Sequence, residues 1–290
     1  MKVTEIFEAR KKEGKPVLSF EIFPPKKEEA LKNIDATLER LCDLRPDFIS
    51  VTFGAGGSAA DNKTIEIAKK IKNNYHVEPI VHLTCLHYGK NEISEMLKYL
   101  EDAGVENILA LRGDVNPNIP VKNDFKYASE LVEYIKSRGD FHISGACYPE
   151  THLEAKDAVS DIHNLKKKVD AGVTHLVSQL FFDNEFFYSF YEKTRIAGID
   201  VPVEAGIMPV TNKAQIERMV NTCGASLPGK FQKIIHKYED KKEALFDAGM
   251  VYALNQIVDL IANDVDGIHI YTMNNVKVAD RICEGIRSLI

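Results

Sequence analysis

Glu21 is the residue of this sequence whose setting best suits acid–base chemistry. It lies in the apolar stretch VLSFEIF (17–23), just before two prolines that end a strand. Successive strand side chains point to opposite faces, so Glu21 points away from the apolar face that carries Phe20 and Ile22. If that apolar face meets surrounding helices, Glu21 lies inside a barrel mouth, where a carboxyl group that has lost water can act as a general acid. The alternative is a buried glutamate paired with an interior arginine or lysine.

A second carboxylate, Asp114, ends the stretch NILALRGD (107–114). Gly113 before it would allow a ligand to approach the backbone closely, and Asp114 would then point into the same mouth as Glu21. An aspartate after a strand equally often caps the next helix or turn. Two carboxylates at two strand ends favour a catalytic site more than either does alone.

Polar residues also recur at helical spacing in DIHNLKKKVDAG (161–172). Asp161, Asn164 and Lys168 are three and four residues apart, so they share one helix face. A solvated polar face is the ordinary explanation, but Tyr148 and His152 lie just upstream and favour a binding site.

The stretch SVTFGAGGSAADNK (50–63) has the spelling of a dinucleotide fingerprint, with Gly54, Gly56 and Ala59 in the required places. A true fingerprint needs an acidic residue after the next strand, whereas Glu78 precedes the next strand, PIVHLTCL (79–86). The glycines are therefore interpreted as a tight turn over a barrel mouth, close to a bound ligand.

Other chemistries find little support. The histidines show no H-E-x-x-H or comparable spacing, so no metal site is predicted, and His82 is expected to be a packed neutral imidazole. No G-x-S-x-G motif is present. The five cysteines are scattered without a C-x-x-C pair, which indicates reduced thiols of a cytoplasmic protein.

The composition is that of a folded enzyme-sized chain, with 44% hydrophobic and 28% charged residues among 290. A net charge of -6 disfavours nucleic acid and anionic membranes as partners. The N-terminal segment reads as a short charged helix without a signal peptide. No uninterrupted run of about 18 apolar residues is present, so no membrane span is predicted.

Apolar, β-branched stretches alternate with amphipathic ones along the whole chain, which predicts a single (β/α)8 TIM barrel domain over residues 1–290. The segment 211–266 is too long for one helix and is expected to form two or three extra helices, broken near 224–230, between strands seven and eight. The expected strands are 17–23, 48–53, 79–86, 107–113, 142–148, 175–182, 201–207 and 267–273.

The chain resembles the methylenetetrahydrofolate reductase family over residues 17–285, with the family motifs in the same order. The motifs that carry the resemblance are SFEIFPPK, SVTFGAGGS, HLTC, LALRGD, YPETH, NLKKKVDAG, QLFFD and YTMN. The resemblance implies a (β/α)8 barrel that holds FAD, in agreement with the pattern of strands and helices.

The resemblance also implies roles for individual residues. Glu21 matches the catalytic acid that helps open the folate ring, Asp114 matches a catalytic aspartate beside both flavin and pterin, and Gln179 matches a glutamine that binds the pterin. Gln215 and Tyr271 match positions that line the site shared by folate and nicotinamide. The implied FAD contacts are Thr52, His82, Arg112, Gly113, Asp114, Tyr127, Ala128, Tyr148, His152, Asp161, Asn164, Lys167 and Lys168.

The reaction implied is ping-pong. NADH or NADPH reduces FAD and leaves, and 5,10-methylenetetrahydrofolate then takes its place and is reduced to 5-methyltetrahydrofolate. The resemblance further implies a cytoplasmic homo-oligomer of one-carbon and methionine metabolism, and it leaves open a partner protein that delivers electrons. Because the sequence ends after the barrel, control by S-adenosylmethionine is not expected.

Two positions depart from the family pattern. Asn275 stands where better-known bacterial members carry an arginine near the folate tail, and Met219 stands where they carry an aromatic residue. Lys277 is a candidate replacement for the arginine charge. Two other hypotheses are a flavin-free barrel enzyme, such as a methyltransferase or aldolase, and a non-catalytic partner subunit. The expected strand ends offer no Schiff-base lysine, and both carboxylates are present, which disfavours these two hypotheses.

Overall fold

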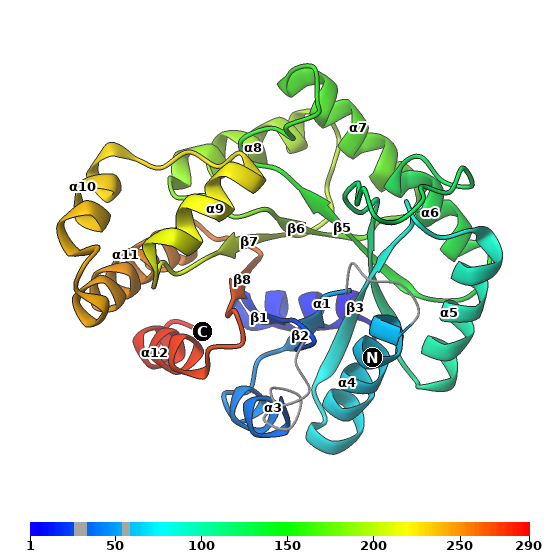
Figure 1. Cartoon of the computed structure of the whole chain (residues 1–290), viewed down its shortest axis with the longest axis horizontal. Coiled ribbons are helices and arrows are strands. Elements are labelled where there is room, and N and C mark those ends of the chain that lie inside the picture. Colours follow the sequence, from blue (N-terminus) through cyan, green and yellow to red (C-terminus); the bar gives the residue numbers. More distant parts are fainter. Residues whose placement is uncertain (26–33, 54–58) are drawn as a thin grey trace.

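The computed structural model is a closed parallel barrel surrounded by helices (Figure 1). It describes residues 1–25, 34–53 and 59–290, without the side chains of residues 59–62. Each strand pairs with the next along the chain, and the last pairs with the first. The strands are β1 Val17–Ile22, β2 Phe48–Val51, β3 Glu78–Thr84, β4 Asn107–Leu111, β5 His142–Cys147, β6 His175–Ser178, β7 Val203–Ile207 and β8 Gly267–Tyr271.

Helices follow the strands and form the outer layer of the barrel, except that α1 precedes β1 and lies across one end (Figure 1). Their apolar stripes face the sheet and their polar faces are exposed, as amphipathic periodicity requires. They are α1 Val3–Glu13, α3 Ile34–Asp43, α4 Ala59–Tyr75, α5 Lys90–Asp102, α6 Ala128–Lys136, α7 Ala158–Ala171, α8 Asn184–Ile196, α9 Lys213–Cys223, α10 Gly229–Tyr238, α11 Lys242–Ala262 and α12 Val276–Ile286.

The alternation of β1 decides which residues enter the barrel. Phe20 and Ile22 are fully buried in the layer between strands and helices, together with Leu38 and Leu41 of α3. Glu21 lies beside Tyr271 of β8 in the strand register, and its side chain contacts interior residues. The predicted inward orientation of Glu21 is therefore confirmed.

The helix α1 closes the N-terminal end of the barrel. Val3, Ile6 and Phe7 of this helix pack onto interior side chains at the lower strand ends, including Phe48 and Ile80. Burial of an apolar side chain contributes about 1.5–3 kcal/mol. One end of the barrel is thus filled with apolar side chains, which leaves the opposite end for a ligand.

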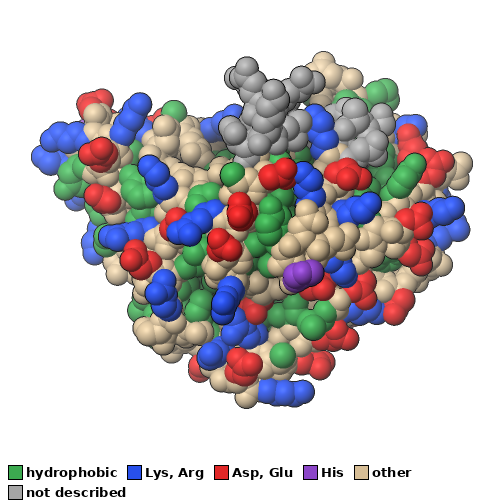
Figure 2. All heavy atoms as spheres, turned by 90° about the horizontal axis from the view of Figure 1, so that it is seen from below, with side chains coloured by type: hydrophobic (Ala, Val, Ile, Leu, Met, Phe, Trp, Pro, Cys, Tyr) green, Lys and Arg blue, Asp and Glu red, His purple; other side chains and the backbone are tan. Residues whose placement is uncertain are grey.

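Between β7 and β8 the chain forms α9, α10 and α11, which confirms the predicted helices and the break near 224–230. By length and composition α11 could cross a membrane, with a mean hydropathy of 1.3. It is a core helix instead: it packs against α8, α10, α12 and β7, and Met250 and Ile257 lie among its buried residues. Acidic and basic side chains are interspersed on the face seen in Figure 2, without a large patch of one sign.

Every strand is shorter than predicted, by one to four residues. The expected strand 175–182 ends at Ser178, and Leu180, Phe181 and Phe182 continue as a buried loop. The expected strand 48–53 ends at Val51. Apolar residues that fill space above a strand end cannot be told from strand residues by hydrophobicity alone.

Candidate active site

Glu21 lies at the barrel mouth between two imidazoles. Its Oε2 atom is 3.6 Å from Nε2 of His82 on β3 and 3.7 Å from Nε2 of His269 on β8. Burial lowers the pKa of His82 to about 4, against the opposing attraction of Glu21, so this imidazole is neutral at neutral pH, as predicted. Glu21 has histidine partners where the alternative explanation expected an arginine or lysine.

Tyr271 and Gln179 form the wall of the mouth between β6 and β8. The Tyr271 hydroxyl donates a hydrogen bond of 2.7 Å to the Ser178 carbonyl, and burial, then the charge of Glu21, raises the pKa of this phenol well above its usual range. A Cβ atom at Gly206 would lie 2.2 Å from the Ser178 carbonyl oxygen, so only glycine leaves room there. The Gln179 side-chain oxygen accepts from Leu180 N at 2.9 Å.

Asp114 lies in the loop after β4, with its side chain exposed. Gly113 before it has φ +86, and a Cβ atom there would lie 3.1 Å from Thr84 Cβ, so the turn requires glycine. Asp114 does not cap the next helix, because α6 begins at Ala128 with Tyr127 as its N-cap. Burial, then the charge of Asp114, raises the pKa of Tyr148 to about 12.

The helix α9 brings a further group to the mouth. Burial, then the carboxylates of Asp114 and Glu21, raises the pKa of the Cys223 thiol to about 11. The two carboxylates predicted from separate strand ends therefore act on one side chain. Gln215 is half-buried in the first turns of α9, and Met219 packs against the apolar cluster that includes Tyr271.

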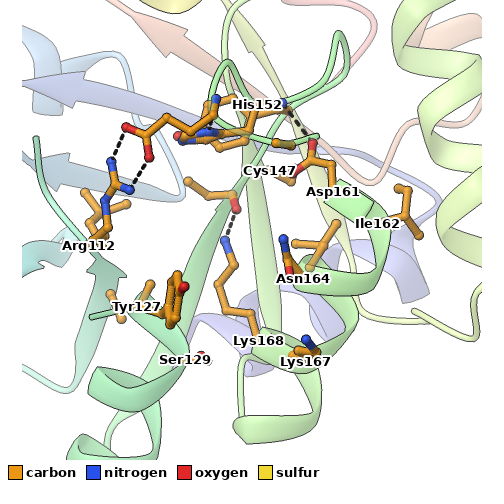
Figure 3. A pocket seen from close by; sticks show the side chains of 18 of the residues that line it. Arg112, Tyr127, Ser129, Cys147, His152, Asp161, Ile162, Asn164, Lys167 and Lys168 are labelled. Carbon is orange, nitrogen blue, oxygen red and sulfur yellow. Dashed lines mark hydrogen bonds and ion pairs between the residues drawn. The ribbon is translucent and has the colours of Figure 1, made fainter. Parts of the chain in front are cut away.

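A cavity of about 340 Å³ opens beside the mouth, between α6 and α7 (Figure 3). Arg112 and Tyr127 lie on one side of it, and Asn164 and Lys167 lie on the other. Nine of the residues expected to bind FAD line it: Arg112, Tyr127, Ala128, Tyr148, His152, Asp161, Asn164, Lys167 and Lys168.

One face of α7 supplies the polar side of this cavity. Lys168 donates a hydrogen bond to the Ala146 carbonyl, and burial lowers the pKa of its ammonium group. Asp161 accepts a hydrogen bond of 2.9 Å from His152 N, which ties the loop after β5 to the helix. The face predicted from the spacing therefore lines a cavity, and it is not merely a solvated surface.

The N-terminus of α6 lies opposite. Ala128 and Ser129 in its first turn line the cavity, and the free N–H groups of a helix N-terminus attract anions. Arg112 makes a bidentate pair with Glu154, one arm of which measures 2.8 Å. A helix N-terminus, an arginine and two lysines together form a site suited to a diphosphate.

The other predicted residues lie around the mouth. Thr52 follows β2 and its N–H donates to the Ile22 carbonyl at 2.9 Å. Asn275 is the N-cap of α12 and accepts from Lys277 N at 3.1 Å, which gives this departure a structural role. Gly54, Gly56 and Gly57 lie outside the described residues. Among the residues that are described, no three potential metal ligands come together.

The sequence interpretation missed three interior or lining residues: His269, Glu204 and Glu154. The first two follow from the alternation of their strands, since His269 shares a face with Tyr271. Nothing in the local sequence distinguishes Glu154 from other acidic loop residues.

Comparison with known proteins adds an independent finding. The family model described as methylenetetrahydrofolate reductase matches residues 6–287. The chain is 35% identical to the 5,10-methylenetetrahydrofolate reductase of Escherichia coli, covering 95% of this chain and 93% of that protein. It is 36% identical to methylenetetrahydrofolate reductase (NADH) 1 of Arabidopsis thaliana, covering 96% of this chain but only 50% of the plant protein. The chain thus spans about half the length of the plant relatives.

Among solved structures, a protein from Clostridium thermocellum superposes with a TM-score of 0.69 and 15% identity, covering 99% of both chains. That protein is described as binding two copies of 5-methyl-5,6,7,8-tetrahydrofolic acid. A tryptophan synthase chain of Mycobacterium tuberculosis superposes with a TM-score of 0.57 and 12% identity. Likeness at this identity supports the barrel fold alone.

Proposed function

The chain belongs to the methylenetetrahydrofolate reductase family, and we propose that it reduces 5,10-methylenetetrahydrofolate to 5-methyltetrahydrofolate with FAD and NADH or NADPH. One observation carries the proposal beyond family membership. A cavity lined by cationic side chains and a helix N-terminus lies beside a mouth that holds Glu21 and Asp114.

The cavity fits the diphosphate and adenosine portion of FAD. The diphosphate would be held by Lys167, Lys168 and the first turn of α6. Arg112 would release Glu154 and bind the diphosphate in its place. The ring of Tyr127 is 62% exposed although it lines the cavity, which suits contact with a planar ligand. Bound there, FAD supplies hydride transfer between nicotinamide and folate.

The mouth would hold the reacting part of the folate. Glu21 would donate the proton that opens the folate ring, and the carboxylate of Asp114 would stabilise the resulting iminium cation. Gln179 and Tyr271 would orient the pterin. Gln215 from α9 would line the space that folate and nicotinamide occupy in turn in a ping-pong order. Thr52, His82 and Gly113 would contact the flavin.

Other expectations belong to this proposal as predictions. The family resemblance favours a cytoplasmic homo-oligomer, and an electron-delivering partner protein is the alternative to direct reduction by NADH or NADPH.

Reconstitution with FAD tests the proposal. We expect a yellow protein whose flavin absorbance is bleached anaerobically by NADH or NADPH and restored by 5,10-methylenetetrahydrofolate. Stopped-flow bleaching with each nicotinamide measures the preference. Protein that folds but binds no FAD would contradict the proposal at its first step, and bleaching by neither nicotinamide would point to a partner protein.

A further inference from the structure

A row of polar side chains runs from the mouth into the buried interior of the barrel. It begins at Glu21 and continues through His269 and Ser19 to Glu204 on β7, whose side chain is fully buried. Ser19 Oγ is 2.6 Å from His269 Nδ1 and donates to Glu204 Oε1 at 2.8 Å. Of these four residues the proposed mechanism uses only Glu21, and it gives no role to His269, Ser19 and Glu204.

The hydrogen bonds restrict where protons can lie. A hydroxyl has one proton, so when Ser19 donates to Glu204 its oxygen accepts from His269 Nδ1–H. The other nitrogen of a neutral His269, Nε2, then offers a lone pair to Glu21, and Glu21 must carry the proton between them. In this arrangement Glu21 is neutral and Glu204 is ionised.

The reverse arrangement uses the same contacts between these four side chains. Protonated Glu204 donates to Ser19 Oγ, Ser19 donates to His269 Nδ1, and His269 Nε2–H points at ionised Glu21. The two arrangements differ by one proton, which moves from one carboxyl to the other without any ring rotation. Along the way an O–H bond of Glu204, an O–H bond of Ser19 and the Nε2–H bond break, and O–H of Ser19, Nδ1–H and O–H of Glu21 form. No electrons are exchanged.

We propose that Ser19 and His269 relay a proton between Glu204 and Glu21, so that Glu204 is a reserve acid that recharges Glu21 from inside the barrel. The inference rests on the proposed role of Glu21 as proton donor. Glu21 Oε2 lies 3.7 Å from His269 Nε2, and a carboxyl movement of about 0.7–1 Å brings the pair to hydrogen-bond distance. With flavin and folate over the mouth, an internal source replaces the excluded water.

Other ionisable groups surround both carboxyls. The imidazoles of His82 and His269 lie beside Glu21, and the charge of Glu21 acts on Tyr271 and Cys223. Glu204 faces His175, with its Oε2 atom 3.1 Å from Nε2 of that histidine, although neither of these atoms has a hydrogen bond of good geometry.

The chain offers a matched pair of serines for the test. Ser19 and Ser144 are both fully buried, and each bridges two side chains. Ser144 bridges His142 and His175 on the far side of Glu204. Only Ser19 lies between the two carboxyls, so Ser19→Ala breaks the relay, while Ser144→Ala removes an equally buried hydroxyl and leaves the relay intact.

The first experiment titrates the carboxyl groups of the protein without FAD or folate. Glutamate is labelled with 13C at its carboxyl, and the Glu21 and Glu204 resonances are assigned with E21Q and E204Q. Groups that share a proton titrate in common steps. We expect both resonances to move at the same pH values in the wild type and in S144A, and to move independently in S19A. Independent titration in the wild type, or unchanged coupling in S19A, would overturn the relay.

The second experiment follows the reduced flavoprotein reacting with 5,10-methylenetetrahydrofolate in single turnovers. We expect S19A to slow this step about tenfold while flavin reduction by nicotinamide stays within about twofold of wild type, since a relay contributes part of a general-acid effect. S144A should leave both steps within about twofold. Equal slowing in the two variants would assign the loss to packing and overturn the relay. Coupled titration in a protein that fails to reduce the folate would uphold the relay and contradict only the proposed reaction.

Discussion

The carboxyl group of Glu21 is paired only with imidazoles among the described residues. An arginine or lysine would hold it as a permanent anion, whereas a neutral imidazole leaves room for a proton. His82 is neutral because it is buried, and His269 is held by Ser19. This arrangement suits a group that gives up and regains a proton in each turnover.

We expect Glu21→Gln to separate the two halves of the reaction. Glutamine keeps the shape of the side chain but cannot donate an acid proton, so folate reduction should fall by about 10²–10⁴-fold. Flavin reduction by NADH or NADPH needs no proton from Glu21 and should stay within about twofold. Stopped-flow absorbance of the flavin measures both steps. Equal loss in both would show that Glu21 serves binding or folding instead of proton donation.

The buried His82 should make the protein acid-sensitive. Its pKa is about 4 in the folded protein against 6.5 in the unfolded chain, so the unfolded state binds more protons between these values. Its contribution is complete above about pH 6.5 and is lost as the pH falls toward 4, by roughly 3 kcal/mol. Urea unfolding of the FAD-free protein across this range measures the loss.

Comparison with His82→Gln isolates this contribution, because other groups titrate in the same range. The variant should lose less free energy of unfolding than the wild type between pH 6.5 and 4. His163→Asn, which removes an exposed histidine on α7, should follow the wild-type curve. Parallel curves for the wild type and His82→Gln would contradict the assigned pKa.

At the scale of elements, the cation-rich cavity lies between the first turn of α6 and one face of α7. The helix α6 points its N-terminus at the cavity and α7 presents a side face, so backbone dipoles and lysine charges act on the same ligand. The loop after β5 is fixed to α7 through the His152–Asp161 hydrogen bond. A mobile loop would give less precise ligand geometry than this pair of helices does.

Two adjacent lysines on α7 provide a test of this arrangement. Lys167 lines the cavity, whereas Lys166 pairs with Asp170 and does not line it. Lys167→Ala should weaken FAD binding about tenfold, which corresponds to loss of one charge-assisted contact. Lys166→Ala should change it less than about twofold. Equilibrium titration of flavin fluorescence measures both, and equal weakening would indicate a general charge effect instead of a contact.

The order of strands and helices could be predicted from the sequence because apolar periodicity is local. The helical face of Asp161, Asn164 and Lys168 could be predicted for the same reason. Glu204 and His269 were missed although alternation places them inside, because each lies within an apolar strand and outside any motif. The pairing of Arg112 with Glu154 joins separate loops, and no local pattern contains that information.

At the scale of the whole molecule, the two ends of the barrel have different roles. The C-terminal strand ends carry Glu21, Gln179 and the cavity, while α1 seals the N-terminal end with apolar side chains. Such barrels generally place catalysis at the first end and stability at the second. The interior row from Glu21 to Glu204 connects the catalytic end with the buried interior.

The seal at the N-terminal end should therefore affect stability without affecting the cavity. Phe7 of α1 is 7% exposed, and its ring centroid lies 4.8 Å from that of His175. Phe7→Ala should lower the free energy of unfolding by about 3–5 kcal/mol, the usual cost of removing a buried aromatic ring. FAD affinity, measured by fluorescence titration below the unfolding temperature, should stay within about twofold, because α1 contributes no residue to the cavity between α6 and α7. Phe186→Ala on α8 is the control: that ring is 39% exposed, so its loss should cost less than about 1 kcal/mol. A stable Phe7→Ala protein would show that α1 does not seal the barrel, and a folded one with weakened FAD binding would show that the two ends are coupled.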